Sequence, residues 1–67
     1  MMYLHEIPRE SKIKVDEGMI TFHHTDGMYS YCTADWSKPG EPNNVHLHVM
    51  TPLEKVEDYY VIKSREE

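Results

Sequence analysis

MITFHHTDGMYSYCTA, the stretch from Met19 to Ala34, decides the fold. An Asp-Gly pair between two alternating segments is the strongest short-range signal for a β-hairpin, because both residues tolerate the positive φ of a type I′ turn. We therefore predict a hairpin whose two-residue loop is Asp26-Gly27. In this register Phe22 faces Tyr31, so that both arms place their bulkiest residues on one face, as a half-buried hairpin requires.

The predicted register assigns every side chain of the hairpin to one of two faces. The inward face carries Ile20, Phe22, His24, Tyr29, Tyr31 and Thr33, and the outward face carries Met19, Thr21, His23, Thr25, Met28, Ser30, Cys32 and Ala34. We expect the aromatic rings to form the core, because the chain has only one Phe and one Trp besides its tyrosines. The alternative is an exposed platform on which single-stranded bases stack.

Segments on both sides of the hairpin also have strand character. Ser11–Asp16 alternates apolar and polar residues, Val45–Met50 places its valines and leucine on one face and its histidines on the other, and Tyr59–Lys63 is rich in β-type residues. Thr51–Glu54 has the composition of a short helix start, with Thr as N-cap and Pro in the first turn. Asp35–Asn44 contains two prolines, one glycine and two asparagines, which is typical of an exposed loop.

Together these segments predict an all-β domain, or a β domain with one short helix or 3-10 turn. We expect a small, five-stranded, antiparallel, strongly bent sheet, or a barrel of the Src-homology-3-like kind, because closure hides strand edges. The second choice is a three- or four-stranded sheet packed on a short helix at Pro52. Residues 1–67 form one domain, with residues 1–10 as a lead segment and residues 64–67 as a frayed tail.

The length and charge of the chain narrow the classes of function. A chain of 67 residues buries only roughly 60% of its unfolded surface, so a deep catalytic cleft is not expected. We expect neither an enzyme nor a cofactor. Twelve acidic residues against seven basic ones give a net charge of −5, opposite to the balance of most nucleic-acid binders. The partner expected from this charge is another protein with a basic surface.

Cysteine content and hydropathy predict the compartment. Cys32 is the single cysteine, which excludes an intramolecular disulfide and fits a reducing environment. No apolar run approaches the ~20 residues of a membrane span, and the start of the chain lacks a signal-peptide core. We therefore expect a cytoplasmic protein.

The histidines and the cysteine allow two chemical alternatives. The five histidines are His5, His23, His24, His46 and His48. A tetrahedral zinc site could take His23, Cys32, His46 and His48. The sequence lacks Cys-x-x-Cys or His-x₃-His spacing, so we favour half-exposed strand histidines and expect no metal. Cys32 could act as a nucleophile with His23 as base, but nothing in the sequence supplies an oxyanion hole or a third residue.

The loop after the hairpin is the predicted partner-binding site. Trp36 stands at its beginning, where a Trp either covers one end of the barrel or anchors a partner interface. Loops on a rigid sheet are also where binding residues concentrate. The predicted contact residues are Trp36, Lys38, Pro39, Glu41, Asn43 and Asn44.

The sequence resembles small, mostly uncharacterised proteins encoded by tailed bacteriophages. The likeness covers roughly Ile7 to Val49 and is carried by the run TFHHTDGMYSYC, by PRESKI at residues 8–13 and by Val45-His46-Leu47. It implies a phage setting rather than an activity. Our expectation is a non-enzymatic protein-binding module, such as a phage early protein that binds and modulates a host enzyme. The alternative is a metal-binding or single-stranded nucleic-acid-binding β-barrel.

Overall fold

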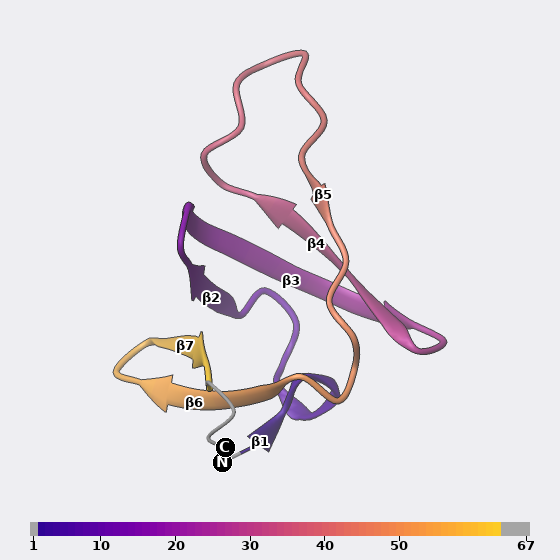
Figure 1. Cartoon of the computed structure of the whole chain (residues 1–67), viewed down its shortest axis with the longest axis vertical. Helices are drawn as coiled ribbons and strands as arrows, with labels where there is room; N and C mark the ends of the chain where they lie inside the picture. The colour runs from indigo at the N-terminus through magenta and orange to yellow at the C-terminus, as the bar shows by residue number, and fades with distance from the viewer. Residues whose placement is uncertain (1, 64–67) are drawn as a thin grey trace.

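One curved, seven-stranded sheet forms the framework of the described chain (Figure 1). The computed structural model describes residues 2–63. Its strands are β1 (Met2–Tyr3), β2 (Lys12–Val15), β3 (Gly18–Asp26), β4 (Tyr29–Ala34), β5 (Asn44–Val45), β6 (Pro52–Val56) and β7 (Tyr59–Ile62), with a 3-10 turn η1 (Leu4–Glu6) after β1. The order across the sheet is β1-β6-β7-β2-β3-β4-β5, and within it β2 and β7 run parallel while all other neighbours are antiparallel.

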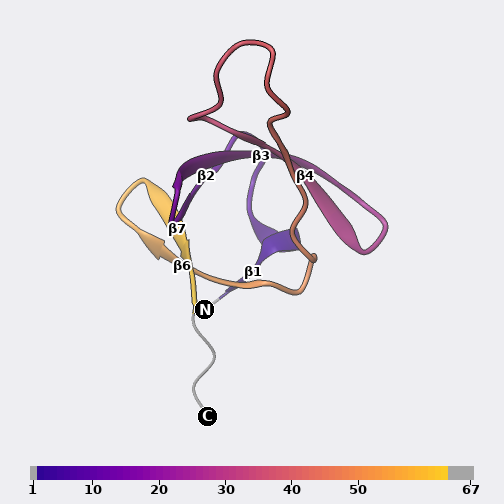
Figure 2. The ribbon, with the colours of Figure 1, turned by 45° about the horizontal axis from the view of Figure 1, so that its top comes forward.

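The predicted all-β class is confirmed, but the predicted count and pairing are wrong. The sheet has seven strands instead of five, and it is mixed because β7 lies parallel to β2. It curls round on itself without closing, since no ladder joins β1 to β5 (Figure 2). The Src-homology-3-like barrel is therefore not confirmed.

The segment between β5 and β6 lies between the two edges of the sheet and forms isolated hydrogen bonds to both. On one side, Ser30 N–H donates to the Leu47 carbonyl and Val49 N–H donates to the Met28 carbonyl, at 2.8 and 2.9 Å. On the other side, His5 N–H donates to the Val49 carbonyl at 3.2 Å. This segment therefore anchors the N-terminal turn beside the tip of the β3–β4 hairpin.

The central hairpin exists, but its register differs from the predicted one. Asp26 pairs with Tyr29, so the loop is Gly27-Met28, and only Gly27 has a positive φ, of 71°. A loop with glycine first needs one left-handed residue, whereas the predicted Asp26-Gly27 loop needs two. The register then shifts between Phe22 and His24, which leaves His23 as a β-bulge.

The new register turns the two tyrosines of β4 away from the core. Phe22 pairs with Cys32, and Phe22 is buried while Tyr31 is 44% exposed, so the predicted common inward face of Phe22 and Tyr31 is wrong. The small residues of β4 point inward instead, namely Ser30, Cys32 and Ala34. They fit there because larger side chains from other strands already fill the interior.

Those larger side chains come partly from the N-terminus, which was expected to be a lead segment. Leu4 is completely buried and Ile7 is 5% exposed, and β1 pairs with β6. The core consists of Leu4, Ile7, Ile13, Ile20, Phe22, Cys32, Ala34, Leu53 and Tyr60. The N-terminal segment is therefore an integral part of the fold. The predicted frayed tail, residues 64–67, lies outside the described residues.

Other predicted elements were right in part. The strand expected in Ser11–Asp16 is confirmed as β2, and Tyr59–Lys63 contains β7. In Val45–Met50 the predicted inner face is confirmed for Val45 and Leu47, which pack against the core. The regular strand ends at Val45 and continues only as a bridge at His48. The predicted helix at Thr51–Glu54 is wrong, since Pro52 begins strand β6.

The side chain of Thr51 explains why the helix-like pattern failed. Its hydroxyl donates to the His48 carbonyl at 2.6 Å and so stabilises the turn before the strand instead of capping a helix after it. Leu53, which follows Pro52 in β6, is completely buried in the core. Among residues 2–63, no helix is long and apolar enough to cross a membrane.

Candidate binding surface

The outer side of β3, of β4 and of the segment that follows β5 carries a strip of aromatic and imidazole rings. We call it the aromatic face, and it consists of His24, Tyr29, Tyr31, His46 and His48. Pairing of His24 with Tyr31 and of Tyr29 with His48 brings these residues to one side, because alternate residues of paired strands share a face. The strip therefore crosses three neighbouring chain segments at the hairpin end of the sheet.

Tyr31 lies at the centre of the aromatic face, between two imidazoles. Its ring is stacked on His46, with centroids 5.0 Å apart and an interplanar angle of 25°. His24 meets it edge-on from the other side at 5.2 Å and 77°. Tyr29 and His48 form a second, T-shaped pair at 5.4 Å. Both tyrosines are thus held by neighbouring rings.

Much of this ring surface is open to solvent. Tyr29 is 54% exposed and Tyr31 is 44% exposed. Two methionines extend the apolar surface at the same end of the sheet: Met28 in the hairpin loop is 65% exposed, and Met50, whose N–H donates to His48 Nδ1, is 50% exposed. The prediction that Tyr29 and Tyr31 belong to the core is therefore wrong, whereas Phe22, the third ring of that prediction, is buried.

Backbone contacts fix which nitrogen each imidazole offers. His46 Nδ1 lies 3.0 Å from the Ser30 carbonyl oxygen, which can only accept, so Nδ1 carries the hydrogen and Nε2 of the neutral ring is an acceptor. His48 Nδ1 accepts from Met50 N–H at 3.1 Å, so its Nε2 carries the hydrogen and is a donor. The aromatic face thus offers one acceptor and one donor beside its tyrosines.

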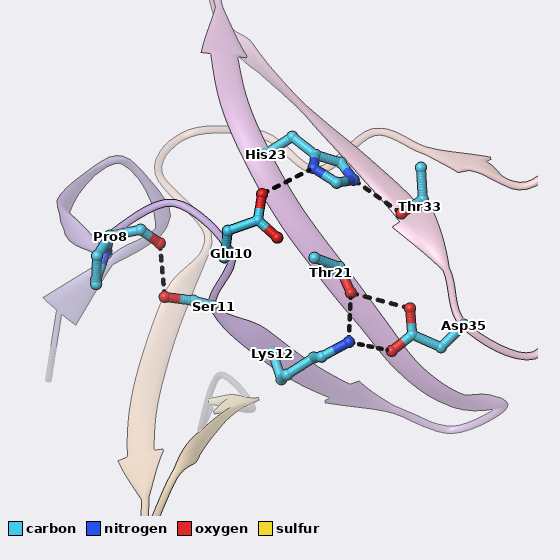
Figure 3. A network of polar contacts seen from close by, with 8 residues as sticks. All are labelled: Pro8, Glu10, Ser11, Lys12, Thr21, His23, Thr33 and Asp35. Carbon is cyan, nitrogen blue, oxygen red and sulfur yellow. Dashed lines mark hydrogen bonds and ion pairs between the residues drawn. The ribbon is translucent and has the colours of Figure 1, made fainter.

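A polar network covers the outer side of the sheet next to the aromatic face (Figure 3). Lys12 Nζ donates to Thr21 Oγ1 and to Asp35 Oδ2, both at 2.7 Å, and Thr21 Oγ1 donates to Asp35 Oδ1 at 2.9 Å. Burial by itself would raise the pKa of Asp35. The hydrogen bonds from Lys12 and Thr21 and the charge of Lys12 outweigh it and lower that pKa from its ordinary value of 3.8. This triad joins β2, β3 and the start of the loop.

His23, the bulged residue, connects to a hydroxyl and not to the cysteine. Its Nε2 shares a hydrogen bond of 2.8 Å with Thr33 Oγ1, and its Nδ1 lies 3.8 Å from Glu10 Oε2 (Figure 3). An acid, an imidazole and a hydroxyl in this order can activate a nucleophile. Here 3.8 Å is longer than a hydrogen bond, so the 77%-exposed Glu10 side chain does not orient the ring.

Cys32 lies on the opposite side of the sheet from the histidines of the alternative zinc site. It is 1% exposed, and its Sγ lies 3.4 Å from Ser30 Oγ. His46 lies on the outer face, so the structure does not bring the four proposed ligands together. No group of three or more potential ligands converges within residues 2–63. Burial raises the pKa of the Cys32 thiol although the Ser30 hydrogen bond lowers it, which does not favour a reactive thiolate.

The predicted partner-binding loop is exposed and closed at its base. Ala34 N–H donates to the Asn43 carbonyl at 2.7 Å, and Lys38 and Glu41 hydrogen-bond each other across the tip. All the predicted contact residues are exposed, namely Trp36, Lys38, Pro39, Glu41, Asn43 and Asn44. Asn44 belongs to β5 and not to the loop. Exposure agrees with a role in binding without establishing one.

Trp36 packs against the start of β3 and remains partly exposed. Its ring covers Gly18, where an added Cβ would come within 3.1 Å of Trp36 Cε3, yet the residue is 44% exposed. Gly18 begins β3 and His24 lies six residues further along, a distance of about 20 Å in a strand. The structure therefore separates Trp36 from the aromatic face along β3.

No protein family model, curated protein or solved structure matches this chain. The candidate site consequently depends on the surface chemistry described above. His24, Tyr29 and Tyr31 were predicted to face the core, with an exposed stacking platform of tyrosines as the alternative, and they lie on the outer surface. In the sequence, Tyr29 and Tyr31 alternate with the small residues Ser30 and Cys32. This alternation indicates that the tyrosines share one face of the strand, but it does not indicate whether that face is buried or exposed.

Proposed function

We propose that this protein is a small, non-enzymatic module that binds another protein through the aromatic face. The observation that carries the proposal is the concentration of exposed large side chains at one end of the sheet, namely Met28, Tyr29, Tyr31 and Met50. In the setting implied by the sequence resemblance, the protein is a cytoplasmic phage early protein that binds and modulates a host enzyme. The Trp36–Asn44 loop is proposed as a second contact.

The chemistry of the aromatic face supports protein binding. Aromatic residues and methionine are enriched at protein interfaces, and tyrosine provides large contact area with little loss of side-chain entropy. Tyr31 is already held between His24 and His46, so little of its freedom remains to be lost when a partner binds. A face of this kind is suited to a rigid anchor role.

Charge supports a partner with a basic surface around its contact area. The chain has a net charge of −5, and complementary charge mainly raises the rate of association. One carboxylate lies beside the aromatic face, because Asp26 pairs directly with Tyr29 and so shares its side of the sheet. An apolar patch on the partner can therefore contact the tyrosines while a basic residue beside that patch meets Asp26.

Single-stranded nucleic acid is the second candidate, because exposed tyrosines on a sheet are typical stacking platforms for bases. Two observations weigh against it. No Lys or Arg occurs in β3, β4 or β5, and Lys12 beside them is engaged by Asp35. Without cations along the path of the phosphates, the main electrostatic contribution to binding is missing.

The test is capture of partners from bacterial lysate by the immobilised protein, with quantitative mass spectrometry and an oligonucleotide competitor. Tyr31→Ala should lose the captured partner while its melting temperature stays close to that of the wild type. Ile62→Ala is the matched control, because Ile62 is 39% exposed but belongs to β7, away from the aromatic face. Equal capture by all three proteins, or displacement of every partner by oligonucleotide, would contradict the proposal.

A further inference from the structure

Strand β5 is one edge of the sheet, and its outer side is open. β4 lies on one side of β5, and no strand within residues 2–63 pairs with the other side. The carbonyls of Asn43 and Leu47 accept from β4. Because backbone groups of alternate residues point in opposite directions in an antiparallel strand, the N–H and C=O groups of Asn44 and His46 point away from β4.

The opposite edge of the sheet, strand β1, differs from β5 because a side chain blocks one of its outward backbone groups. In β1 the N–H of Tyr3 donates to Glu6 Oε1 at 2.7 Å, so a carboxylate on η1 occupies the outward donor. Proteins commonly block sheet edges with charged side chains of this kind. β5 and the segment after it carry no charged side chain of this kind. No Asp, Glu, Lys or Arg occurs from Pro42 to Leu53, which is the longest stretch of the sequence without a charged residue.

We propose that β5 pairs with β5 of a second copy of this chain, antiparallel and about a two-fold axis at Val45. In this register Asn44 of each copy lies opposite His46 of the other, and the two residues exchange their outward N–H···O bonds. The outward donors and acceptors of this edge match those of an identical edge rotated by the two-fold axis, as an isologous interface requires. The proposal does not depend on the protein partner proposed above.

The absence of charge on this edge favours a second copy as the occupant. Two chains that each carry −5 repel one another, and any acidic side chain at the contact would add to that repulsion. The edge is free of acidic residues where the backbones would meet. Because His46 stacks on Tyr31, pairing at β5 would also place the aromatic faces of the two copies side by side.

Sedimentation velocity over a range of concentrations tests the dimer with Asn44→Pro. The wild type should approach twice the 8.0 kDa of one chain as concentration rises. Proline removes the outward N–H of Asn44, which donates to no described residue, and should raise the dissociation constant by about tenfold or more. Asn44→Ala is the matched control: it keeps the N–H and should stay within about threefold of the wild type.

Val45→Cys tests the register independently of the stability of the proline variant. Directly opposed residues in a non-hydrogen-bonded antiparallel pair have Cα atoms about 4.5 Å apart, which a disulfide can bridge. Val45 pairs directly with Cys32 of its own chain, so the cysteine is introduced in a Cys32→Ala background to prevent an intramolecular disulfide. Under mild oxidation this Val45→Cys variant should form a covalent dimer. The wild type should not, because its Cys32 is buried. A wild type that stays monomeric at all concentrations, or a dimer that Asn44→Pro leaves intact with no Val45→Cys cross-link, would overturn the proposal.

Discussion

The two sides of the β3–β4 hairpin use side chains in opposite ways. On the inner side, Phe22 pairs with Cys32, and both are buried among aliphatic residues from four other segments. On the outer side, Tyr31 pairs with His24, and nearly half of the tyrosine remains exposed. The single bulge at His23 separates the two arrangements along the same strand.

This difference teaches that ring size does not decide which side of a strand is buried in a small domain. The inner side of β4 carries small residues in a core whose larger fully buried side chains, Leu4, Ile13, Ile20 and Leu53, come from other segments. The tyrosines are then left outside, where they stack with histidines and not with the core. Four substitutions test whether the hairpin has a structural side and a binding side.

The largest effect is expected from Phe22→Ala on the inner side. Removing a buried aromatic ring leaves a cavity and costs about 3–5 kcal/mol, which on a domain of this size is enough to unfold it. Circular dichroism melts should show loss of the cooperative transition. A Phe22→Ala protein that melts like the wild type would show that the inner side is not the core.

The sequence alone could predict elements whose signal is local. The alternation in Ser11–Asp16 and the hairpin signal at Asp26-Gly27 both led to correct strands. The register could not be predicted, because the bulge at His23 has no local signature and one residue of slip exchanges the two faces. Leu4 was missed as a core residue because its burial depends on β6, about fifty residues away along the chain.

An intermediate effect is expected from Trp36→Ala at the base of the loop. The Trp36 ring is partly exposed and covers Gly18, so its loss should cost about 1–2 kcal/mol of stability. Chemical denaturation measures this change. If Trp36 is instead purely a partner anchor, the denaturation midpoint will stay unchanged while partner capture falls.

A smaller effect on stability is expected from Tyr31→Ala on the outer side. The ring lies on the surface and makes contacts with two imidazoles, each worth about 0.5 kcal/mol. Its removal should therefore change the free energy of unfolding by about 1 kcal/mol or less. Chemical denaturation of Tyr31→Ala and Phe22→Ala compares the loss of one ring on each side of the hairpin. Equal losses of stability would contradict the division into a structural and a binding side.

The candidate site was less predictable than the fold, for a physical reason. The aromatic face joins residues of β3 and β4 to His46 and His48, and these meet only because the chain after the long loop returns beside β4. The exposed loop itself was predictable from its prolines, glycine and asparagines. Local composition therefore located the loop, whereas the aromatic face depends on long-range pairing.

The smallest effect is expected from Asp35→Asn, and it should depend on pH. The pKa of Asp35 is lower in the folded protein than its ordinary value of 3.8, because Lys12 and Thr21 stabilise the carboxylate. A group with a lowered pKa contributes stability that is fully present above its unfolded value and is lost as pH falls through the folded value. The Asp35 side chain is 34% exposed, so solvent screening limits this contribution to about 0.5–1 kcal/mol.

Denaturant titrations of the wild type and of Asp35→Asn at neutral pH and below pH 3.8 measure this contribution. At neutral pH the variant should be less stable by that amount, and the difference should shrink as the wild-type carboxylate becomes protonated. Asp16→Asn is the matched control, because it removes the same charge from a carboxylate that has no ion pair with a described residue. If the difference in stability between the wild type and Asp35→Asn stays constant across this pH range, Asp35 acts through packing alone. The ion pair with Lys12 would then contribute nothing to stability.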